Sequence, residues 1–279
     1  AKIALDQVAR SSLVIDRAKP LMRAGIEGVL RGKPVSVTAF RDPALAEYVN
    51  KTLKKRNISA IYVFSGQMGQ YVPADFTGRI IMDFVDVDSA KFAAYGEQKG
   101  AARGWIDARE ARFLRAEEER LALRADISLL VSDEEAALFS QRLSPAARPI
   151  CDVRALRLGI DSDHYDPATV NAEAALCAMP SPRLIFTGQM DYAPNIVAAH
   201  RVIERLMPSI RELFPKASFH VVGRNPPDAL RGLHGKNGIF VWGAVDDMPG
   251  HLAAADLALI SGQKPVITIS RKSIATYKL

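Results

Sequence analysis

Residues 183–195 read RLIFTGQMDYAPN, and this stretch decides the fold. It begins with an apolar run of strand length, continues directly into Gly188, and places Pro194 where the first turn of a helix would begin. A strand that leads through a glycine loop into a helix is typical of a parallel sheet covered by helices. The same succession recurs in both halves of the chain, which predicts an α/β protein throughout.

Two sets of such units follow one another along the chain. We expect strands over residues 60–64, 79–84, 126–131, 183–187, 218–222, 239–242 and 256–260, with an extended piece at 153–156. We expect helices over residues 16–30, 44–56, 89–123, 134–143, 195–214, 228–233 and 248–254. A core-facing stripe is predicted within 195–214 at Ile196, Ile203, Leu206, Met207, Ile210 and Phe214. Residues 161–182, rich in Asp, Ala and Pro, suit a linker, so the predicted domains are 1–160 and 161–279.

Composition excludes several classes of protein. The 279 residues are 48% hydrophobic and 24% charged, as in ordinary folded proteins. No apolar run reaches the length of a membrane-spanning helix, and the first residues lack the pattern of a signal peptide. The two cysteines match no metal or redox spacing and the five histidines match no zinc site, so a cytoplasmic protein without a bound metal is predicted.

The positive charge is uneven. The whole chain has a net charge of +6, yet residues 1–60 alone hold 12 basic and 5 acidic residues. A solvated basic face and a peripheral contact with the inner face of a membrane both fit this excess. Nucleic acid is not expected as a partner, because interleaved aromatic residues and any nucleic-acid-binding module are missing.

Both ends differ from those of a complete α/β domain. Only residues 2–5 could form a strand before the first basic helical stretch, and residues 261–279 contain no Glu and no helical period. We therefore expect the fold to be incomplete at both ends.

Three loops in the second half point to a ligand. They span residues 188–195, 223–227 and 243–247, and each opens with glycine directly after an apolar strand. Ligands of open α/β sheets bind beyond the carboxyl ends of the strands, where helix N-termini attract phosphate. Arg224 is placed where its guanidinium could bind a diphosphate through two hydrogen bonds. Asp246 and Asp247 precede a helix, so capping of that helix explains them without any ligand and is the preferred interpretation.

The first half offers weaker motifs. Asp86-Val87-Asp88 has the D-x-D form that can hold a divalent metal on a nucleotide diphosphate, but the pattern is short and common. Capping of the following helix by Asp88 and Ser89 explains it without a metal and is the preferred interpretation. Ser132 and Glu135 have the spacing of a capping box. The usual dinucleotide and P-loop fingerprints are absent from the sequence.

Taken together, these stretches resemble the retaining family-four glycosyltransferases, and most closely their exosortase-associated exopolysaccharide subgroup. The resemblance runs from about Val29 to Leu259, although Leu158 stands where relatives usually carry Asn. The matching stretches are residues 29–42, SGQMGQYV at 65–72, IMDFVDVDSAKFAAY at 81–95, ADISLLVSDEEAALF at 125–139, LGIDSDHYDP at 158–167, FTGQMDYAPN at 186–195, HVVGRNPP at 220–227 and GAVDDMPGHLAAADLAL at 243–259.

The resemblance implies two Rossmann-like domains facing a cleft, the GT-B arrangement, with the donor on the second domain. It implies that Gly188, Gln189, Asp191, Asn195, Gly223, Arg224, Gly243 and Asp246 bind the donor nucleotide. Residues 65–68 and 83–88 would lie on the acceptor side. Arg224 is the candidate for leaving-group stabilisation and Asp86 the candidate catalytic residue of the acceptor side.

The activity implied is transfer of a hexose, with retention, from a nucleotide diphosphate sugar, which we expect to be UDP-linked. The acceptor would be lipid-linked or a polysaccharide, as in exopolysaccharide biosynthesis. No cofactor and no metal are expected. The alternative is a catalytically deficient relative that only binds nucleotide or mediates assembly. A nucleotide-sugar epimerase of the same shape is disfavoured, because the sequence offers no convincing set of acid and base residues.

Overall fold

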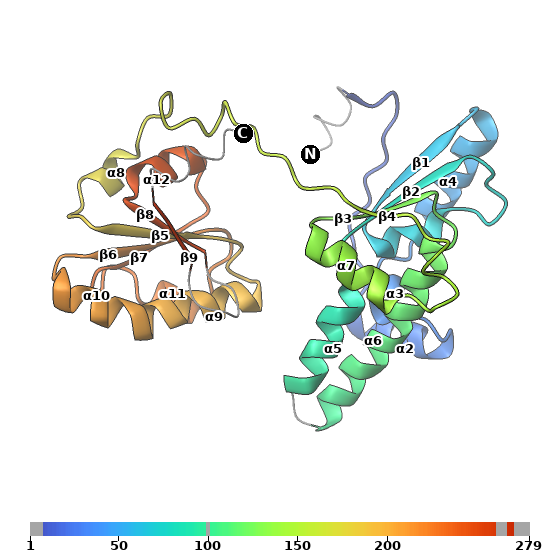
Figure 1. Ribbon diagram of the computed structural model, residues 1–279, viewed down its shortest axis with the longest axis horizontal. Coiled ribbons are helices and arrows are strands. Elements are labelled where there is room, and N and C mark those ends of the chain that lie inside the picture. Colours follow the sequence, from blue (N-terminus) through green and yellow to red (C-terminus); the bar gives the residue numbers. More distant parts are fainter. Residues whose placement is uncertain (1–7, 99–100, 261–266, 271–279) are drawn as a thin grey trace. The chain divides into compact units, whose positions relative to one another are not determined.

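The computed structural model describes residues 8–98, 101–260 and 267–270. The chain divides into two compact units, Ala1–Gly159 and Ile160–Leu279, which are called unit 1 and unit 2 below. Each unit has its own sheet and its own helices (Figure 1). Among the described residues, no helix is both long and apolar enough to cross a membrane.

Unit 1 is built on a four-stranded parallel sheet in the order β1-β2-β3-β4. The strands are β1 (Ala60–Phe64), β2 (Arg79–Val85), β3 (Ile127–Leu130) and β4 (Val153–Ala155). Neighbouring strands along the chain are also neighbours in the sheet. All four carboxyl ends therefore lie at one edge of the sheet, where a ligand site is expected in this class of fold.

Helices surround this sheet. They are α2 (Leu21–Leu30), α3 (Val35–Ala39), α4 (Pro43–Lys55), α5 (Asp88–Gln98), α6 (Ala101–Ala122) and α7 (Asp133–Arg142), with a 3-10 helix, η1, at Gly66–Tyr71. Asp42 begins α4 by accepting the N–H groups of Ala44 and Leu45. Ser132 begins α7 by accepting the N–H of Glu135, but the carboxylate of Glu135 accepts from Val87 rather than closing a capping box.

Two helix predictions in unit 1 are wrong. The helix expected from residue 16 begins at Leu21 instead, because Pro20 disfavours a helical conformation in the residue before it. The expected helix over 89–123 is two helices, α5 and α6, which pack against each other (Figure 1). Residues 99–100, which separate them in the sequence, lie outside the described residues.

The core of unit 1 lies between the sheet and the helices. Phe84 on β2 packs against Phe139 on α7 with ring centroids 4.7 Å apart, and both side chains are buried. Met82 and Leu130 complete the buried faces of β2 and β3. An apolar cluster of this kind fixes the positions at which β1 and β2 end, and so positions the loops that follow them.

Unit 2 has a five-stranded sheet in the order β7-β6-β5-β8-β9. The strands are β5 (Arg183–Thr187), β6 (Ser218–Val222), β7 (Ile239–Gly243), β8 (Leu257–Ile260) and β9 (Ile267–Ser270). The first four are parallel, and β9 pairs with β8 in the antiparallel direction. The rest of the segment 261–279 lies outside the described residues.

The helices of unit 2 cover both faces of its sheet. They are α8 (Ala174–Cys177), α9 (Ala193–Arg201), α10 (Met207–Leu213), α11 (Asp228–Arg231) and α12 (Met248–Ala254). Figure 1 shows α9, α10 and α11 along one face, with α8 and α12 on the other. One π-helical turn, Val202–Leu206, joins α9 to α10, where the sequence predicted one uninterrupted helix. It precedes Pro208, which has no N–H for the regular helical hydrogen bond.

The predicted apolar stripe of this helical region is largely confirmed. Met207 is buried, and Ile203, Leu206 and Ile210 pack on the core cluster of the sheet. Phe214 is the exception, because its side chain is 54% exposed. Since α10 ends at Leu213, Phe214 leaves the helical spacing that would have turned it toward the sheet.

Candidate functional site

The three glycine loops of unit 2 lie together at the carboxyl edge of its sheet. The Gly188 N–H donates to the Val222 carbonyl at 3.1 Å, and the Gly223 N–H donates to the Gly243 carbonyl at 2.7 Å. The Met190 N–H donates to the Arg224 carbonyl at 2.8 Å. The loops after β5, β6 and β7 are therefore joined through their backbones, and we call them the triple loop.

Gly223 is required by a close approach of two backbones. A Cβ at this position would lie 1.6 Å from the Gly188 carbonyl oxygen, which is far inside van der Waals contact. Gly243 is required for a different reason, because its φ of +74° is left-handed while the space around it is open. Glycine at position 223 therefore lets two loops meet at a distance that no side chain would permit, whereas glycine at position 243 permits the left-handed turn.

Side chains tie the triple loop together a second time. The Asn195 Nδ2 donates to the Gln189 carbonyl at 3.0 Å, and the Asn225 Nδ2 donates to Asp191 Oδ2 at 2.9 Å. The hydrogen bond from Asn225, followed by one from Gln189, lowers the pKa of the exposed Asp191. Asn225 has a left-handed φ of +56°, which asparagine tolerates better than most residues.

Arg224 is held loosely within the triple loop. One guanidinium nitrogen, Nη2, lies 3.5 Å from Gln189 Oε1, at the limit of a hydrogen bond. The side chain is exposed, and its other N–H groups have no partner among the described residues. A guanidinium in this state has donors left for an anion.

The two aspartates after β7 have different surroundings. Asp247 caps α12, because its Oδ1 accepts the Gly250 N–H at 2.8 Å. The side chain of Asp246 is exposed and makes no hydrogen bond or ion pair within the part of the chain that the structure describes. Capping thus explains Asp247, whereas the carboxylate of Asp246 is available to contact a ligand at the carboxyl edge of the sheet.

Beneath these loops lies a neutral buried histidine that the sequence analysis did not single out. His220 Nδ1 accepts from Trp242 Nε1 at 3.1 Å, so its Nε2 carries the proton and donates to Ser218 Oγ at 2.8 Å. Burial lowers the pKa of His220 to about 4. The available signal was the Ser-x-His spacing, since alternate residues of a strand share one face.

The predicted acceptor-side segments of unit 1 also meet. Gln67 Nε2 donates to Asp88 Oδ2 at 2.8 Å, joining the segment after β1 to the segment after β2. Lys91 Nζ lies 2.6 Å from Asp86 Oδ2 and 3.4 Å from Asp88 Oδ1. Burial alone would lower the pKa of Lys91, but these two carboxylates raise it overall. The D-x-D motif is thus paired with a lysine, which offsets one of its two negative charges.

Two of these acceptor-side residues adopt unusual backbone conformations. Ser65 has a φ of +74° and Val85 a φ of +70°, which is rare for a β-branched residue. The Ser65 N–H donates to the Asp83 carbonyl at 2.7 Å. The Asp83 side chain accepts a hydrogen bond from the Tyr62 hydroxyl, which raises the pKa of Tyr62 to about 12. Tyr62 was missed in the sequence, because its place on β1 reads as ordinary strand.

Within the described residues, no group of three or more His, Cys, Asp or Glu side chains is placed to hold a metal ion. Asp86 and Asp88 contact Lys91 and Gln67, as described above. The alternative of simple helix capping is not what the structure shows either, because the Ser89 N–H and hydroxyl both donate to the carboxylate of Glu118.

Comparison with known proteins finds similarity to glycosyltransferases. Residues 181–269, which carry the triple loop, match the family described as Glycosyl transferases group 1. HepE (Alr3699) of Anabaena, solved in complex with UDP-glucose, aligns with a TM-score of 0.56 at 15% identity, covering 95% of this chain and 64% of its own. The trehalose 6-phosphate synthase of Burkholderia multivorans aligns with a TM-score of 0.56 at 10% identity, covering 85% and 58%.

A third solved structure is the UDP-forming trehalose-phosphate synthase of Burkholderia xenovorans in complex with glucose-6-phosphate. It aligns with a TM-score of 0.54 at 14% identity, over 85% of this chain and 59% of its own. These likenesses show the fold, which is the α/β fold with two parallel-strand sheets of GT-B glycosyltransferases, as predicted. The chain spans less than two thirds of the length of each of these three proteins.

Proposed function

We propose that this chain belongs to a glycosyltransferase in which the triple loop binds the diphosphate of a nucleotide sugar. The observation that carries the proposal is the meeting of three backbone loops around the free guanidinium of Arg224. The family match over residues 181–269 and the likeness to HepE, solved with UDP-glucose, support a uridine-linked donor.

The parts of the triple loop contribute differently to this site. The N–H groups of Gly188 and Gly223 are already bonded to carbonyls, so these residues give close approach rather than hydrogen bonds. Positive charge comes from Arg224 and from the N-terminal end of the nine-residue helix α9. Asn195 and Asp191 hold the loop in shape, and Asp246 is available to contact the nucleoside.

Breaking the anomeric C–O bond leaves a nucleoside diphosphate, and stabilising that growing negative charge is the main catalytic task. Arg224 has the charge and the free donors for this role. We propose transfer of a hexose with retention, in which the leaving phosphate assists the incoming hydroxyl, so no protein nucleophile is required. No cofactor and no metal ion enter this proposal.

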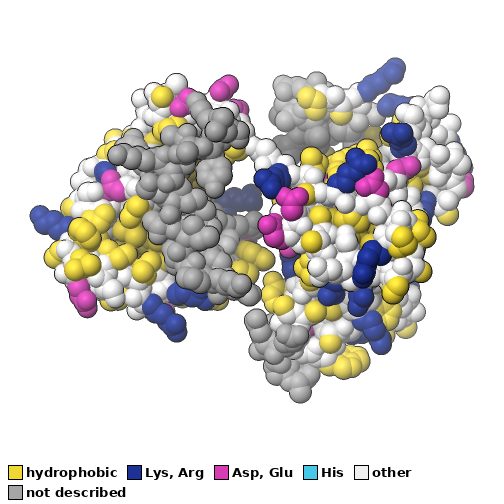
Figure 2. Space-filling model, viewed as in Figure 1, with side chains coloured by type: hydrophobic (Ala, Val, Ile, Leu, Met, Phe, Trp, Pro, Cys, Tyr) yellow, Lys and Arg dark blue, Asp and Glu magenta, His cyan; other side chains and the backbone are white. Residues whose placement is uncertain are grey.

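The acceptor side is assigned to unit 1. Asp86, which Lys91 fixes in place by an ion pair, would contact the acceptor hydroxyl. We propose a lipid-linked or polysaccharide acceptor and a role in exopolysaccharide biosynthesis of the exosortase-associated kind. The basic residues of the first 60 positions would then contact the cytoplasmic face of a membrane. Figure 2 shows Lys and Arg side chains spread over unit 1 on the face it draws.

The test is calorimetric titration of the whole chain with UDP. We expect binding that weakens about tenfold or more in Arg224→Gln, because a charge-assisted bond to the diphosphate is lost. The matched control is Arg205→Gln, which removes the same charge from an exposed residue of the π-helical turn. Equal UDP affinities in the two variants would overturn the assignment of Arg224.

A second measurement separates transfer from binding. The chain is incubated with UDP-glucose and a glycan acceptor, and release of UDP is followed. Release that stops in Arg224→Gln supports a working transferase. UDP binding without release favours the alternative of a catalytically deficient relative that binds nucleotide or mediates assembly.

A further inference from the structure

Unit 1 contains a basic pocket that the proposed donor site does not use. It is an open pocket of about 590 Å³ between residues 15–20, helix α2 and the turn that leads from α3 into α4. Its lining contains five cationic side chains and three carboxylates. The cations are Arg17, Lys19, Arg23, Arg31 and Arg41, and the carboxylates are Asp16, Glu27 and Asp42.

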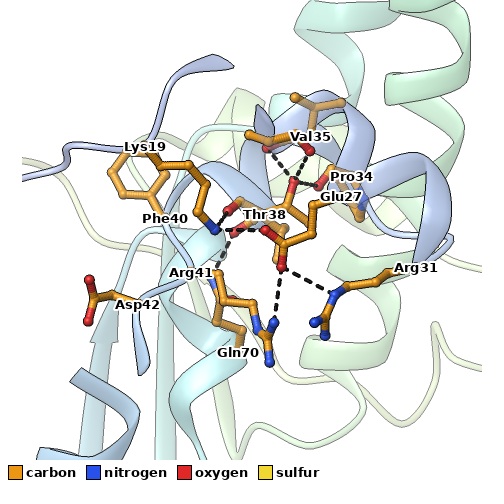
Figure 3. Close-up of polar contacts among 12 residues, drawn as sticks. Lys19, Glu27, Arg31, Pro34, Val35, Thr38, Phe40, Arg41, Asp42 and Gln70 are labelled. Carbon is orange, nitrogen blue, oxygen red and sulfur yellow. Dashed lines mark hydrogen bonds and ion pairs between the residues drawn. The ribbon is translucent and has the colours of Figure 1, made fainter. Parts of the chain in front are cut away.

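Glu27 lies at the centre of this cluster. Lys19 Nζ is 2.9 Å from Glu27 Oε2, while Arg41 Nη1 and Arg31 Nε are 3.0 Å and 3.2 Å from Oε1. Figure 3 shows the three cations pointing toward this one carboxylate from different parts of the chain. Hydrogen bonds from Lys19 and then Arg41 lower the pKa of Glu27, so it remains ionised.

One carboxylate cannot neutralise three cations. The side chains of Arg31 and Arg41 are 52% and 45% exposed, and each uses one nitrogen on Glu27. Their remaining N–H groups have no partner among the described residues, and neither does the guanidinium of Arg23. The Oδ1 of Asp42 is already occupied by the first turn of α4. The pocket thus has a surplus of positive charge and of free donors.

The cluster is anchored in the fold rather than loosely placed on the surface. Lys19 Nζ also donates to the carbonyl of Thr38 at 2.9 Å, and Thr38 is buried. The Thr38 hydroxyl lies 2.8 Å from the Ala24 carbonyl, which links α3 to α2. The guanidinium of Arg17 lies 5.6 Å from the centre of the Phe40 ring. Cations held in this way need little reordering to accept an anion.

An apolar ridge adjoins the pocket on helix α2. Met22 and Leu30 are 80% and 81% exposed, and Ile26 and Val29 are exposed between them. The spacing of these four residues places them on one side of the helix. A ligand with an anionic head and an apolar tail would contact both the pocket and the ridge.

We propose that this pocket binds a phosphoryl or diphosphoryl group. Several planar guanidinium groups and one ammonium around a shared space can pair with the several negatively charged oxygens of such a group. That the ligand is the acceptor of the transfer reaction rests on the proposed function, whereas the anion site itself does not. The phosphate source is either a lipid-linked diphosphate or a soluble sugar phosphate.

The experiment is calorimetric titration of the whole chain with inorganic pyrophosphate, in the presence of saturating UDP to occupy any donor site. We expect binding that weakens with added salt and falls about tenfold or more in the double variant Arg31→Gln/Arg41→Gln. The matched control is Lys55→Gln, which removes an exposed cation outside the pocket lining. Pyrophosphate affinities that are equal in the variant and the control would overturn the proposal.

A second variant tests the pocket independently in case the double variant misfolds. Arg23→Glu reverses a charge at the pocket but breaks no contact within the described residues, so the fold should persist. It should lower pyrophosphate affinity by about tenfold while UDP affinity stays unchanged. Arg224→Gln should show the opposite pattern, so failure of the pocket and failure of the donor site are distinguishable. Unchanged pyrophosphate affinity in Arg23→Glu would also overturn the proposal.

Vesicles separate the two sources of phosphate. Phosphatidylcholine vesicles with a small fraction of an isoprenoid diphosphate are compared with soluble pyrophosphate. Tighter binding to the vesicles that is lost in Met22→Ser/Leu30→Ser assigns a lipid-linked ligand. Equal affinity for vesicles and for pyrophosphate, unaffected by this variant, assigns a soluble sugar phosphate. In both cases the Arg31→Gln/Arg41→Gln variant must lose binding.

Discussion

The two units build their candidate sites from different materials. In unit 2, the triple loop is made by backbone groups, with Gly223 and Gly188 closer than any side chain would allow. In unit 1, the basic pocket is made by long side chains, with Lys19, Arg31 and Arg41 gathered on Glu27. A site made by closely packed backbone is rigid, and a glycine at the point of contact cannot be replaced. A site made by side chains can change its ligand preference through substitution of one residue at a time. We therefore expect unit 2 to hold the constant part of the substrates and unit 1 the variable part.

The largest expected effect is that of Gly223→Ala. Its Cβ would meet the Gly188 carbonyl oxygen at 1.6 Å, and backbone atoms on both sides cannot move away cheaply. We expect a loss of about 4 kcal/mol or more in the free energy of unfolding of unit 2, together with loss of UDP binding. Urea unfolding followed by Trp242 fluorescence, in a Trp105→Phe background, measures the loss in unit 2.

Two control glycines sharpen this result. Gly243→Ala has open space but a left-handed φ, so we expect a cost of about 1 kcal/mol. Gly235→Ala, in unit 2 but outside the triple loop, also combines open space with a left-handed φ of +76° and should cost about 1 kcal/mol as well. If Gly223→Ala cost no more than Gly243→Ala, the close packing of the triple loop would be contradicted.

The second prediction is that pH affects the two units in opposite directions. In unit 2, the pKa of His220 falls from 6.5 to about 4 because of burial, with Arg183 and His251 adding to the effect. In unit 1, burial raises the pKa of Glu118 from 4.5 to about 7, although hydrogen bonds from Ser89 oppose this. Lowering the pH from 7 to 5 should destabilise unit 2 and stabilise unit 1, by about 2 kcal/mol each.

The sign follows from where protons bind. Below pH 6.5 the unfolded chain protonates His220 before the folded unit does, so stability is lost as the pH falls. Above pH 4.5 the unfolded chain ionises Glu118 first, so stability is lost as the pH rises. Amide hydrogen exchange of β6 and β2 core residues at pH 5 and 7 measures each unit separately. His220→Gln and Glu118→Gln should remove the respective dependence, and a shared direction in both units would refute the prediction.

The smallest expected effect separates two neighbouring aspartates. Asp247→Ala removes the cap of α12 and should lower the stability of unit 2 by about 1 kcal/mol. Asp246→Ala removes no contact within the described residues, so stability should stay unchanged while UDP affinity falls. The matched variants are compared by urea unfolding and by titration with UDP. A reversed pattern would mean that the roles of the two residues have been exchanged.

Much of the fold could be predicted from local sequence. The strands at Ala60–Phe64, Arg183–Thr187 and Ser218–Val222 match the predicted ranges, because short apolar runs bounded by polar residues or glycine define both ends. The loops after the strands of unit 2 were predicted to share one edge, since parallel strands end on the same side. The helix boundaries were predicted less well, and the causes were Pro20, which directly precedes α2, and a π-helical turn before Pro208.

The parts that the sequence did not reveal depend on residues far apart in the chain. The basic excess of residues 1–60 was visible in the sequence. That Arg31 and Arg41 meet at Glu27 was not, because this depends on the packing of α2 and α3. The hydrogen bond from Tyr62 to Asp83 likewise requires the pairing of β1 with β2. Roles of such residues follow from tertiary contacts, which no local pattern contains.

The most direct test of the central claim is amide hydrogen exchange of the whole chain with and without UDP. We expect UDP to slow exchange in three separate segments of unit 2, at residues 188–195, 223–227 and 243–247. We also expect UDP to leave exchange around the basic pocket of unit 1 unchanged. Protection confined to other segments, or protection around Glu27 without protection of the triple loop, would contradict the claim that the donor diphosphate binds there.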